Sequence, residues 1–170
     1  MTADDLRTLQ KPLKEKYQTD PSSALITMRA TGEVSVGNLT CRVPTPAGSI
    51  DAGLHPAAAG SGEWACSGDM LLQSLVACAG VTFSAVSTAM GIAIRKATIT
   101  AEGDIDFRGT LGLSKEVPIG VKAVRINFQI DSDAAPEQLA KLVQLTERYC
   151  VIFQTLKHPP EIEVRVTKEG

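Results

Sequence analysis

Cysteines are the residues of this 170-residue chain whose chemistry is most evident from their type and spacing. There are four of them, Cys41, Cys66, Cys78 and Cys150, and no two form a C-x-x-C pair. Zinc-finger and thioredoxin-type sites are therefore unsupported. The first twenty residues mix acids and bases without an apolar core, which predicts no signal peptide and a cytoplasmic setting where thiols stay reduced. The cysteines must act singly or as a pair that the fold assembles.

The rest of the composition excludes several other classes of site. Only two histidines occur, His55 and His158, which rules out a His-rich metal cage. A Ser-His-Asp triad is possible only if one of these two is its histidine. With 17 basic and 19 acidic residues the net charge is −2, so we expect no nucleic-acid partner. Hydrophobic residues make up 44% and charged residues 21%, as in an ordinary globular domain.

Cys78 lies in the middle of a long uncharged stretch, the 25 residues between Asp69 and Arg95. A stretch of this length could cross a bilayer. Polar residues such as Gln73 and Ser74 interrupt it, however, and no cluster of basic residues flanks it. We therefore expect no membrane and a central helix over about residues 68–90, surrounded by a sheet or a partner subunit.

Cys150 is predicted to lie on the apolar face of a second helix. Ser132 or Asp133 can cap this helix and Pro136 suits its first turn. Its apolar face would consist of Leu139, Val143, Thr146, Cys150 and Phe153. Two helices packed about 8–10 Å apart could bring both thiols into bonding reach, for which their Cα atoms must approach within about 7 Å. The alternative is that each cysteine is simply a small buried hydrophobe.

A reactive Cys78 would need help to ionise. It lies about three turns into its own helix, too far from that helix's N-terminus, so we expect a neighbouring cation to activate it. The candidates are Arg29, Arg42 and Arg108, among which periodicity does not choose.

The other elements complete an α+β domain. Residues 1–21 are predicted as a polar helix or arm and residues 22–170 as the domain proper. Strand patterns occur at 25–30, 39–43, 94–108, 117–130 and 161–167, and a long Gly-, Ala- and Pro-rich loop is expected over 44–68. Cys41 would then lie in a strand and Cys66 in this loop, both in structural or incidental roles.

Two segments resemble the OsmC/Ohr family of osmotically inducible and organic hydroperoxide resistance proteins. The segment SGDMLLQSLVACAG, residues 67–80, resembles the family's P-x-E-L-L-L-x-A-L-x-x-C helix. The segment AKLVQLTERYCVIFQTL, residues 140–156, resembles its A-x-x-x-C-P-V-x-x-T-L segment. The two cysteines are 72 positions apart, which also fits, and the resemblance covers about residues 22–168.

This resemblance implies a fold and an activity. The fold would be an OsmC-like one, antiparallel sheets wrapped around two long central helices in an intertwined homodimer. The activity would be the reduction of small organic or lipid hydroperoxides in oxidative or osmotic stress. Cys78 would be the peroxidatic thiolate and Cys150 the resolving cysteine, and a dithiol reductant, lipoyl-linked in the family, would restore both. No metal, flavin or other cofactor is implied.

The chain also departs from the family pattern. Ser67 occupies the position of the family's proline at the start of the helix, and Val151 that of the proline after the second cysteine. Asp69 occupies the position of a longer acidic residue, which in the family holds the activating arginine. Arg29 is the nearest match to that arginine, while Asp69 could instead be a helix cap or first-turn acid.

These departures indicate a divergent branch and keep other functions open. The main alternative is a non-catalytic dimer that binds a small apolar ligand at its interface. A more distant one is a structural or assembly role without a ligand.

Overall fold

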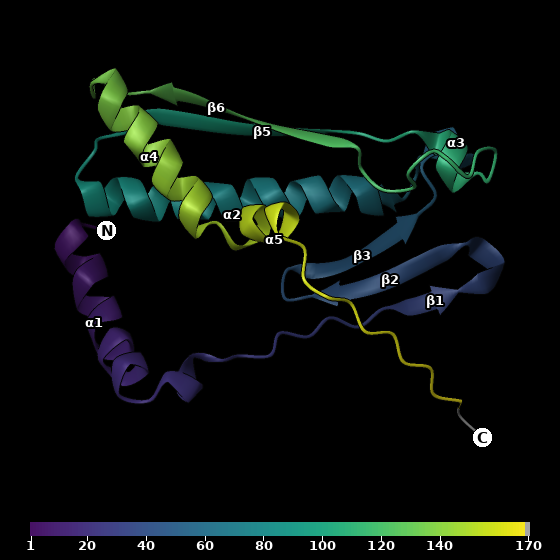
Figure 1. The fold of residues 1–170 in the computed structure, drawn as a ribbon, viewed down its shortest axis with the longest axis horizontal. Coiled ribbons are helices and arrows are strands. Elements are labelled where there is room, and N and C mark those ends of the chain that lie inside the picture. Colours follow the sequence, from purple (N-terminus) through teal and green to yellow (C-terminus); the bar gives the residue numbers. More distant parts are fainter. Residues whose placement is uncertain (169–170) are drawn as a thin grey trace.

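The computed structural model describes residues 1–168. Its helices and strands are α1 (Ala3–Thr19), β1 (Glu33–Ser35), β2 (Thr40–Thr45), β3 (Gly48–Gly53), β4 (Ala65–Cys66), α2 (Ser67–Met90), β5 (Lys96–Asp104), α3 (Phe107–Thr110), β6 (Ala123–Asp131), α4 (Pro136–Tyr149) and α5 (Val151–Lys157). The predicted α+β class, N-terminal polar helix and central helix are confirmed. In Figure 1, the β5–β6 sheet lies along α2, and α4 and α5 pack on the same helix.

The long strands and α2 enclose the core. β5 and β6 pair antiparallel from Lys96↔Asp131 to Asp104↔Ala123, and alternate side chains of each strand are half-buried. The buried face of α2 repeats every four residues and consists of Leu75, Ala79, Phe83 and Ser87. Phe83 stacks on Phe128 of β6 with ring centroids 5.9 Å apart. α4 contributes Leu142, which is 0% exposed. The helix that carries Cys78 is thus packed against the sheet over its buried stretch from Leu75 to Ser87.

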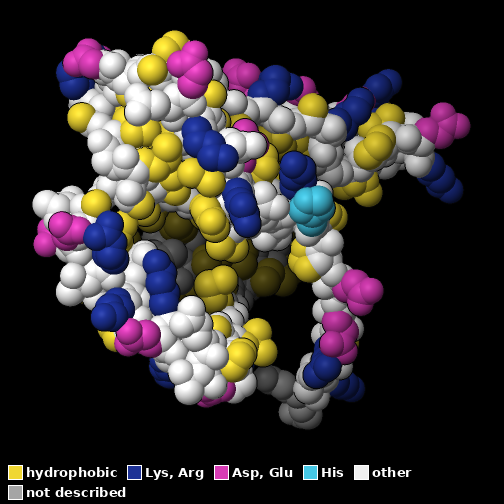
Figure 2. Space-filling view, turned by 60° about the vertical axis from the view of Figure 1, so that its left-hand side comes forward, with side chains coloured by type: hydrophobic (Ala, Val, Ile, Leu, Met, Phe, Trp, Pro, Cys, Tyr) yellow, Lys and Arg dark blue, Asp and Glu magenta, His cyan; other side chains and the backbone are white. Residues whose placement is uncertain are grey.

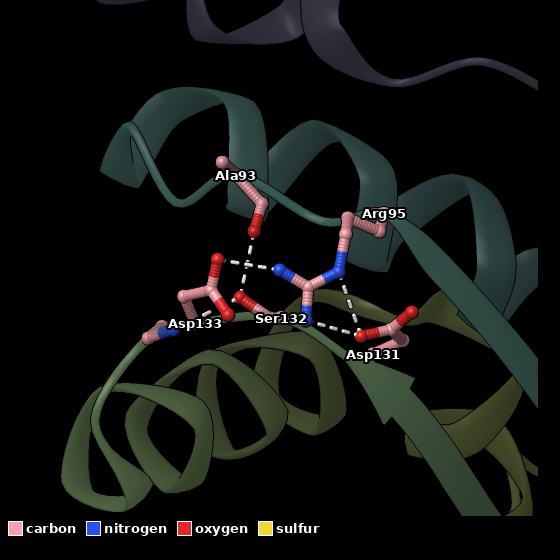
Figure 3. Close-up of polar contacts among 6 residues, drawn as sticks. Ala93, Arg95, Asp131, Ser132 and Asp133 are labelled. Carbon is pink, nitrogen blue, oxygen red and sulfur yellow. Dashed lines mark hydrogen bonds and ion pairs between the residues drawn. The ribbon is translucent and has the colours of Figure 1, made fainter.

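Arg95 joins the end of α2 to the start of α4 (Figure 3). Its guanidinium pairs with Asp131 and with Asp133, both at 2.5 Å, and the Ser132 hydroxyl donates to the Ala93 carbonyl at 2.6 Å. The prediction that Ser132 or Asp133 caps the second helix is therefore wrong, because both side chains are engaged in this cluster. The first turn of α4 is stabilised instead by the Gln138 side chain, which accepts from the N–H of Ala135 at 3.1 Å.

Residues 44–68, predicted as one long loop, contain two strands of a second sheet, while residues 54–64 between those strands form no strand. The sheet has the order β1-β2-β3-β4, with β3 and β4 inside the predicted loop. A tight turn between Thr45 and Gly48 returns the chain, and Gly48 supplies the positive φ of 128° that side-chain-bearing residues rarely adopt. Arg42 of β2 then forms a two-pronged ion pair with Asp51 of β3, at 2.8 and 2.9 Å. The high glycine and alanine content of β3 concealed its strand pattern.

Two predicted strands are not formed. Residues 25–30 and 161–167 have no regular structure in this single chain, and their apolar side chains lie in solvent. Leu25 is 86% exposed and Val166 93% exposed. The C-terminal segment extends away from the rest of the molecule (Figure 1). Both segments carry the alternation of a strand but no neighbouring strand pairs with them.

The single chain leaves much of its surface uncovered. Its accessible surface is 12941 Å², whereas a compact monomer of 18.0 kDa exposes about 8,000 Å². Figure 2 shows hydrophobic side chains gathered in a recess near the middle of one face. Among residues 1–168, α2 is the one helix long and apolar enough to cross a membrane, judged by length and composition alone. In the middle of α2, Val81 is 73% exposed.

Candidate active site

The structure brings Cys78 and Cys150 together. Cys78 lies on α2 and packs against the buried cluster of Leu75, Ala79 and Cys150. Cys150 is not on a helix face as predicted, because the predicted single helix breaks there into α4 and α5. Its backbone is extended (φ −73°, ψ 109°), and its sulfur accepts the Phe153 N–H at 3.5 Å, so that Cys150 caps α5. The side chain is buried, and both cysteines are free thiols.

The break at Cys150 supplies Cys78 with hydrogen-bond donors. The first N–H groups of a helix have no partner within the helix. At the start of α5 these groups belong to Val151 and Ile152, and both lower the pKa of the Cys78 thiol. The Cys150 thiol and the Thr82 hydroxyl, one turn along α2, lower this pKa as well.

These donors shift the pKa of Cys78. Burial raises this pKa, but the N–H of Ile152, the Cys150 thiol, the N–H of Val151 and the Thr82 hydroxyl outweigh burial and hold it below the ordinary value. The reason is that each of these hydrogen bonds favours the charged form. The pKa of Cys78 is therefore shifted in the direction that a nucleophilic sulfur needs.

The pKa of Cys150 moves in the opposite direction. Burial raises it, and the neighbouring Cys78 sulfur raises it further, against the opposing effect of the Phe153 N–H. Two thiols that share a site do not ionise together. Of the two thiols, Cys78 is thus the one that ionises more readily.

The predicted activating arginine is not beside Cys78 within this chain. Arg42 forms an ion pair with Asp51, and Arg108 forms one with Asp106. The hydrogen bond from Arg108 lowers the pKa of Asp106 to about 2. Arg29 lies exposed on the unpaired 25–30 segment. The expected neighbouring cation is therefore not found beside Cys78 among residues 1–168 of the single chain. Backbone N–H groups lower the pKa of Cys78 there, through an element boundary that periodicity does not reveal.

Asp69 is placed apart from the cysteine pair. It lies in the first turn of α2 and lines a cavity of about 320 Å³ together with Cys66 and His55. Within residues 1–168, no carboxylate of Asp69 lies within 4.0 Å of a basic side chain, so the structure does not bring Asp69 and Arg29 together. This position matches the alternative role considered for Asp69, that of an acid in the first turn of the helix.

The other candidates have structural roles. His55 stacks on Phe107 at 4.9 Å, and its Nδ1 accepts the Ala57 N–H. Cys41 lies in β2 and packs closely on Gly32. In the part of the chain that the structure describes, no group of three or more His, Cys, Asp or Glu residues could hold a metal ion.

Position 151 offers a direct test of how the N–H groups affect the pKa of Cys78. The family motif that residues 140–156 resemble has proline at this position. Proline at the first helical position keeps the helix and suits the extended Cys150 before it, but it removes the N–H. We expect Val151→Pro to raise the pKa of Cys78 and slow its alkylation by iodoacetamide at pH 7 severalfold, because the thiolate fraction falls. Peptide mass spectrometry across pH 5–9 measures this, with Val151→Ala, which keeps the N–H, as the control. An unchanged midpoint in Val151→Pro would exclude this N–H as a donor.

A known protein family matches more than half of the chain. The sequence profile of the OsmC-like protein family matches residues 60–165, which include both Cys78 and Cys150. No curated protein sequence matches the chain.

Solved structures share the fold. An OsmC-like protein from Mycoplasma pneumoniae superposes with a TM-score of 0.65 and 16% identity, over 79% of this chain and 89% of that one. An organic hydroperoxide resistance protein from Elizabethkingia anophelis gives 0.63 and 17%, over 79% and 91%. One from Bacillus subtilis gives 0.54 and 16%, over 79% and 93%. With its profile match spanning more than half its length and the same fold in these structures, the chain belongs to the OsmC-like protein family.

Proposed function

We propose that this protein is a thiol peroxidase that reduces organic hydroperoxides to alcohols. The observation that carries the proposal is the packing of Cys78, whose pKa is lowered, against the buried Cys150, whose pKa is raised. Thiolate character sets the rate of attack on a peroxide, and a resolving thiol at hand protects the first sulfur from overoxidation. The names of the structural relatives from Elizabethkingia anophelis and Bacillus subtilis, organic hydroperoxide resistance proteins, support the same chemistry.

The proposed reaction has three steps. The Cys78 thiolate attacks one peroxide oxygen, the O–O bond breaks, and the departing alkoxide takes a proton from water to become the alcohol. Cys78 is then a sulfenic acid, and the Cys150 sulfur displaces its hydroxyl group, which leaves as water with the Cys150 proton. An external dithiol, such as a lipoyl-linked one, reduces the disulfide to two thiols and is itself oxidised to a disulfide. The protein would thus need a reducing compartment, the cytoplasm.

We further propose that the working form is a homodimer. The large exposed surface, the exposed Val81 in α2, and the unpaired 25–30 and 161–167 segments all support a second copy that covers them. Alternation along residues 161–167 would place Ile162, Val164 and Val166 on one face of a strand. Arg29 lies on the other unpaired segment, so we assign it to the site only in the dimer, with Asp69 as its proposed acidic partner.

Counting thiols tests the proposed reaction. We expect one equivalent of tert-butyl hydroperoxide to lower the free thiols of the reduced protein from four per chain to two, with a Cys78–Cys150 disulfide in the peptide map. Cys41 and Cys66 serve as internal controls and should stay free. Four remaining thiols would reject the peroxidase and favour a dimer that only binds a small apolar ligand.

A further inference from the structure

A cavity of about 310 Å³ lies between α2, the start of β6 and α5. Its apolar walls include Leu71, Leu75, Ile126 and Phe153, and its lining carries two lysines, Lys122 and Lys157. This volume is at the lower end of the range for small-molecule pockets, which are mostly apolar with a few polar groups that fix orientation. The cavity therefore has the composition of a ligand site.

The cavity adjoins the cysteine pair. Leu75, Ile126 and Phe153 line it and also belong to the packed cluster that holds Cys78 and Cys150. The Phe153 N–H is the group that donates to the Cys150 sulfur at 3.5 Å. Along α2, Leu71 and Cys78 are two turns apart, about 10 Å. An apolar chain lying in the cavity would thus have one end close to the reactive sulfur.

The charge of the cavity has one sign. Lys122 and Lys157 are the charged residues of its lining, and no carboxylate is among the described residues that line it. The Lys157 ammonium lies 5.9 Å from the centroid of the Phe153 ring, over an apolar wall. Within residues 1–168, neither lysine is within 4.0 Å of a carboxylate oxygen. Lys122 lies near enough to Asp104 and Asp106 to lower the pKa of each, but those carboxylates are paired with arginines. Both ammonium groups can therefore still bind an anion on the ligand.

We propose that this cavity takes amphiphilic substrates, with Lys122 and Lys157 binding an anionic carboxylate while the apolar chain leads toward Cys78. The proposal rests on the proposed function and makes the two lysines its specificity-determining residues. They would favour a carboxylate-bearing hydroperoxide over an uncharged one with the same chain. Neither lysine takes part in the reaction at sulfur, so a small uncharged peroxide should react equally well without them.

Binding of unreactive probes tests the lysines without any turnover. We expect calorimetry on the reduced full-length protein to show decanoate binding about fivefold tighter than 1-decanol at low ionic strength, and the preference to shrink as salt screens the charges. Lys122→Gln/Lys157→Gln should lose the preference, and Lys122→Arg/Lys157→Arg should keep it. Lys115→Gln/Lys141→Gln, which alters lysines outside the cavity, is the matched control. Equal affinity for the two probes, no binding of either, or a preference that survives in Lys122→Gln/Lys157→Gln would overturn the proposal.

Kinetics separate this proposal from the peroxidase itself. We expect kcat/KM for a fatty-acid hydroperoxide to exceed that for its methyl ester, and the difference to vanish in Lys122→Gln/Lys157→Gln with tert-butyl hydroperoxide turnover unchanged. If tert-butyl hydroperoxide is reduced but the acid and the ester react alike, the lysine proposal fails and the peroxidase stands. If no peroxide is consumed while decanoate still binds through the lysines, the peroxidase fails and the anion site stands.

Discussion

Cys78→Ser is expected to lower the rate of organic hydroperoxide consumption by about a thousandfold or more, because loss of a nucleophile removes the whole covalent route. A serine hydroxyl in the same place stays protonated, since its pKa lies far above that of a thiol even with the N–H groups of Val151 and Ile152 directed at it. The measurement is peroxide loss with a dithiol reductant in excess. Serine is close in size to cysteine and Cys78 is only half-buried, so we expect the fold to be retained.

Two further variants define what the first result means. Cys150→Ser should permit one turnover and leave a sulfenic acid on Cys78 that a dimedone-type reagent traps, because no resolving thiol remains. The serine can still accept the Phe153 N–H that caps α5. Cys66→Ser, which alters a thiol in a different cavity, should retain full activity. Continued peroxide reduction by Cys78→Ser would mean that another thiol is the nucleophile, and the proposed roles would be abandoned.

The second large effect is expected in assembly. Ile162→Asp/Val164→Asp should convert a dimer of about twice the 18.0 kDa chain mass into a monomer. In this chain both side chains lie in solvent at 86% and 82% exposure, so the substitutions should hardly change the stability of the protomer. In a dimer they would place two carboxylates in an apolar interface, and burying unpaired charges is costly. Sedimentation velocity distinguishes the two forms.

The opposite face of the same segment supplies the control. In an alternating strand Glu163 points away from Ile162 and Val164, so Glu163→Gln should leave the dimer intact. If Arg29 reaches the site only from the partner, the monomeric variant should also lose peroxidase activity. A monomer formed by the unaltered chain, or a dimer that survives both aspartates, would show that residues 161–167 are not an interface.

The elements that position Cys78 could be predicted because local patterns define them. An uncharged run between Asp69 and Arg95 has the length and polarity of one central helix, and α2 occupies Ser67–Met90. Alternation likewise predicted β5 and β6, because each buries one face of a strand. The short strands β3 and β4 escaped prediction, because glycine and alanine carry little of that signal.

The unpaired segments mark where local pattern stops being sufficient. Residues 25–30 and 161–167 have strand periodicity and yet no strand in the single chain. Period-two alternation shows which side chains share a face, but it does not say which neighbour supplies the hydrogen bonds. The alternation alone therefore leaves the pairing partner of these segments undetermined.

By itself, the sequence determined the type of chemistry: two thiols on apolar elements, far apart along the chain, in a protein with too few histidines for a His-rich metal cage. Only the tertiary structure decided which sulfur ionises and by what means. The helix break at Cys150 turns the first N–H groups of α5 toward Cys78, and the same break buries Cys150. A thiol's pKa depends on donors within a few ångströms, and here those donors come from backbone some seventy residues away, which no local pattern records.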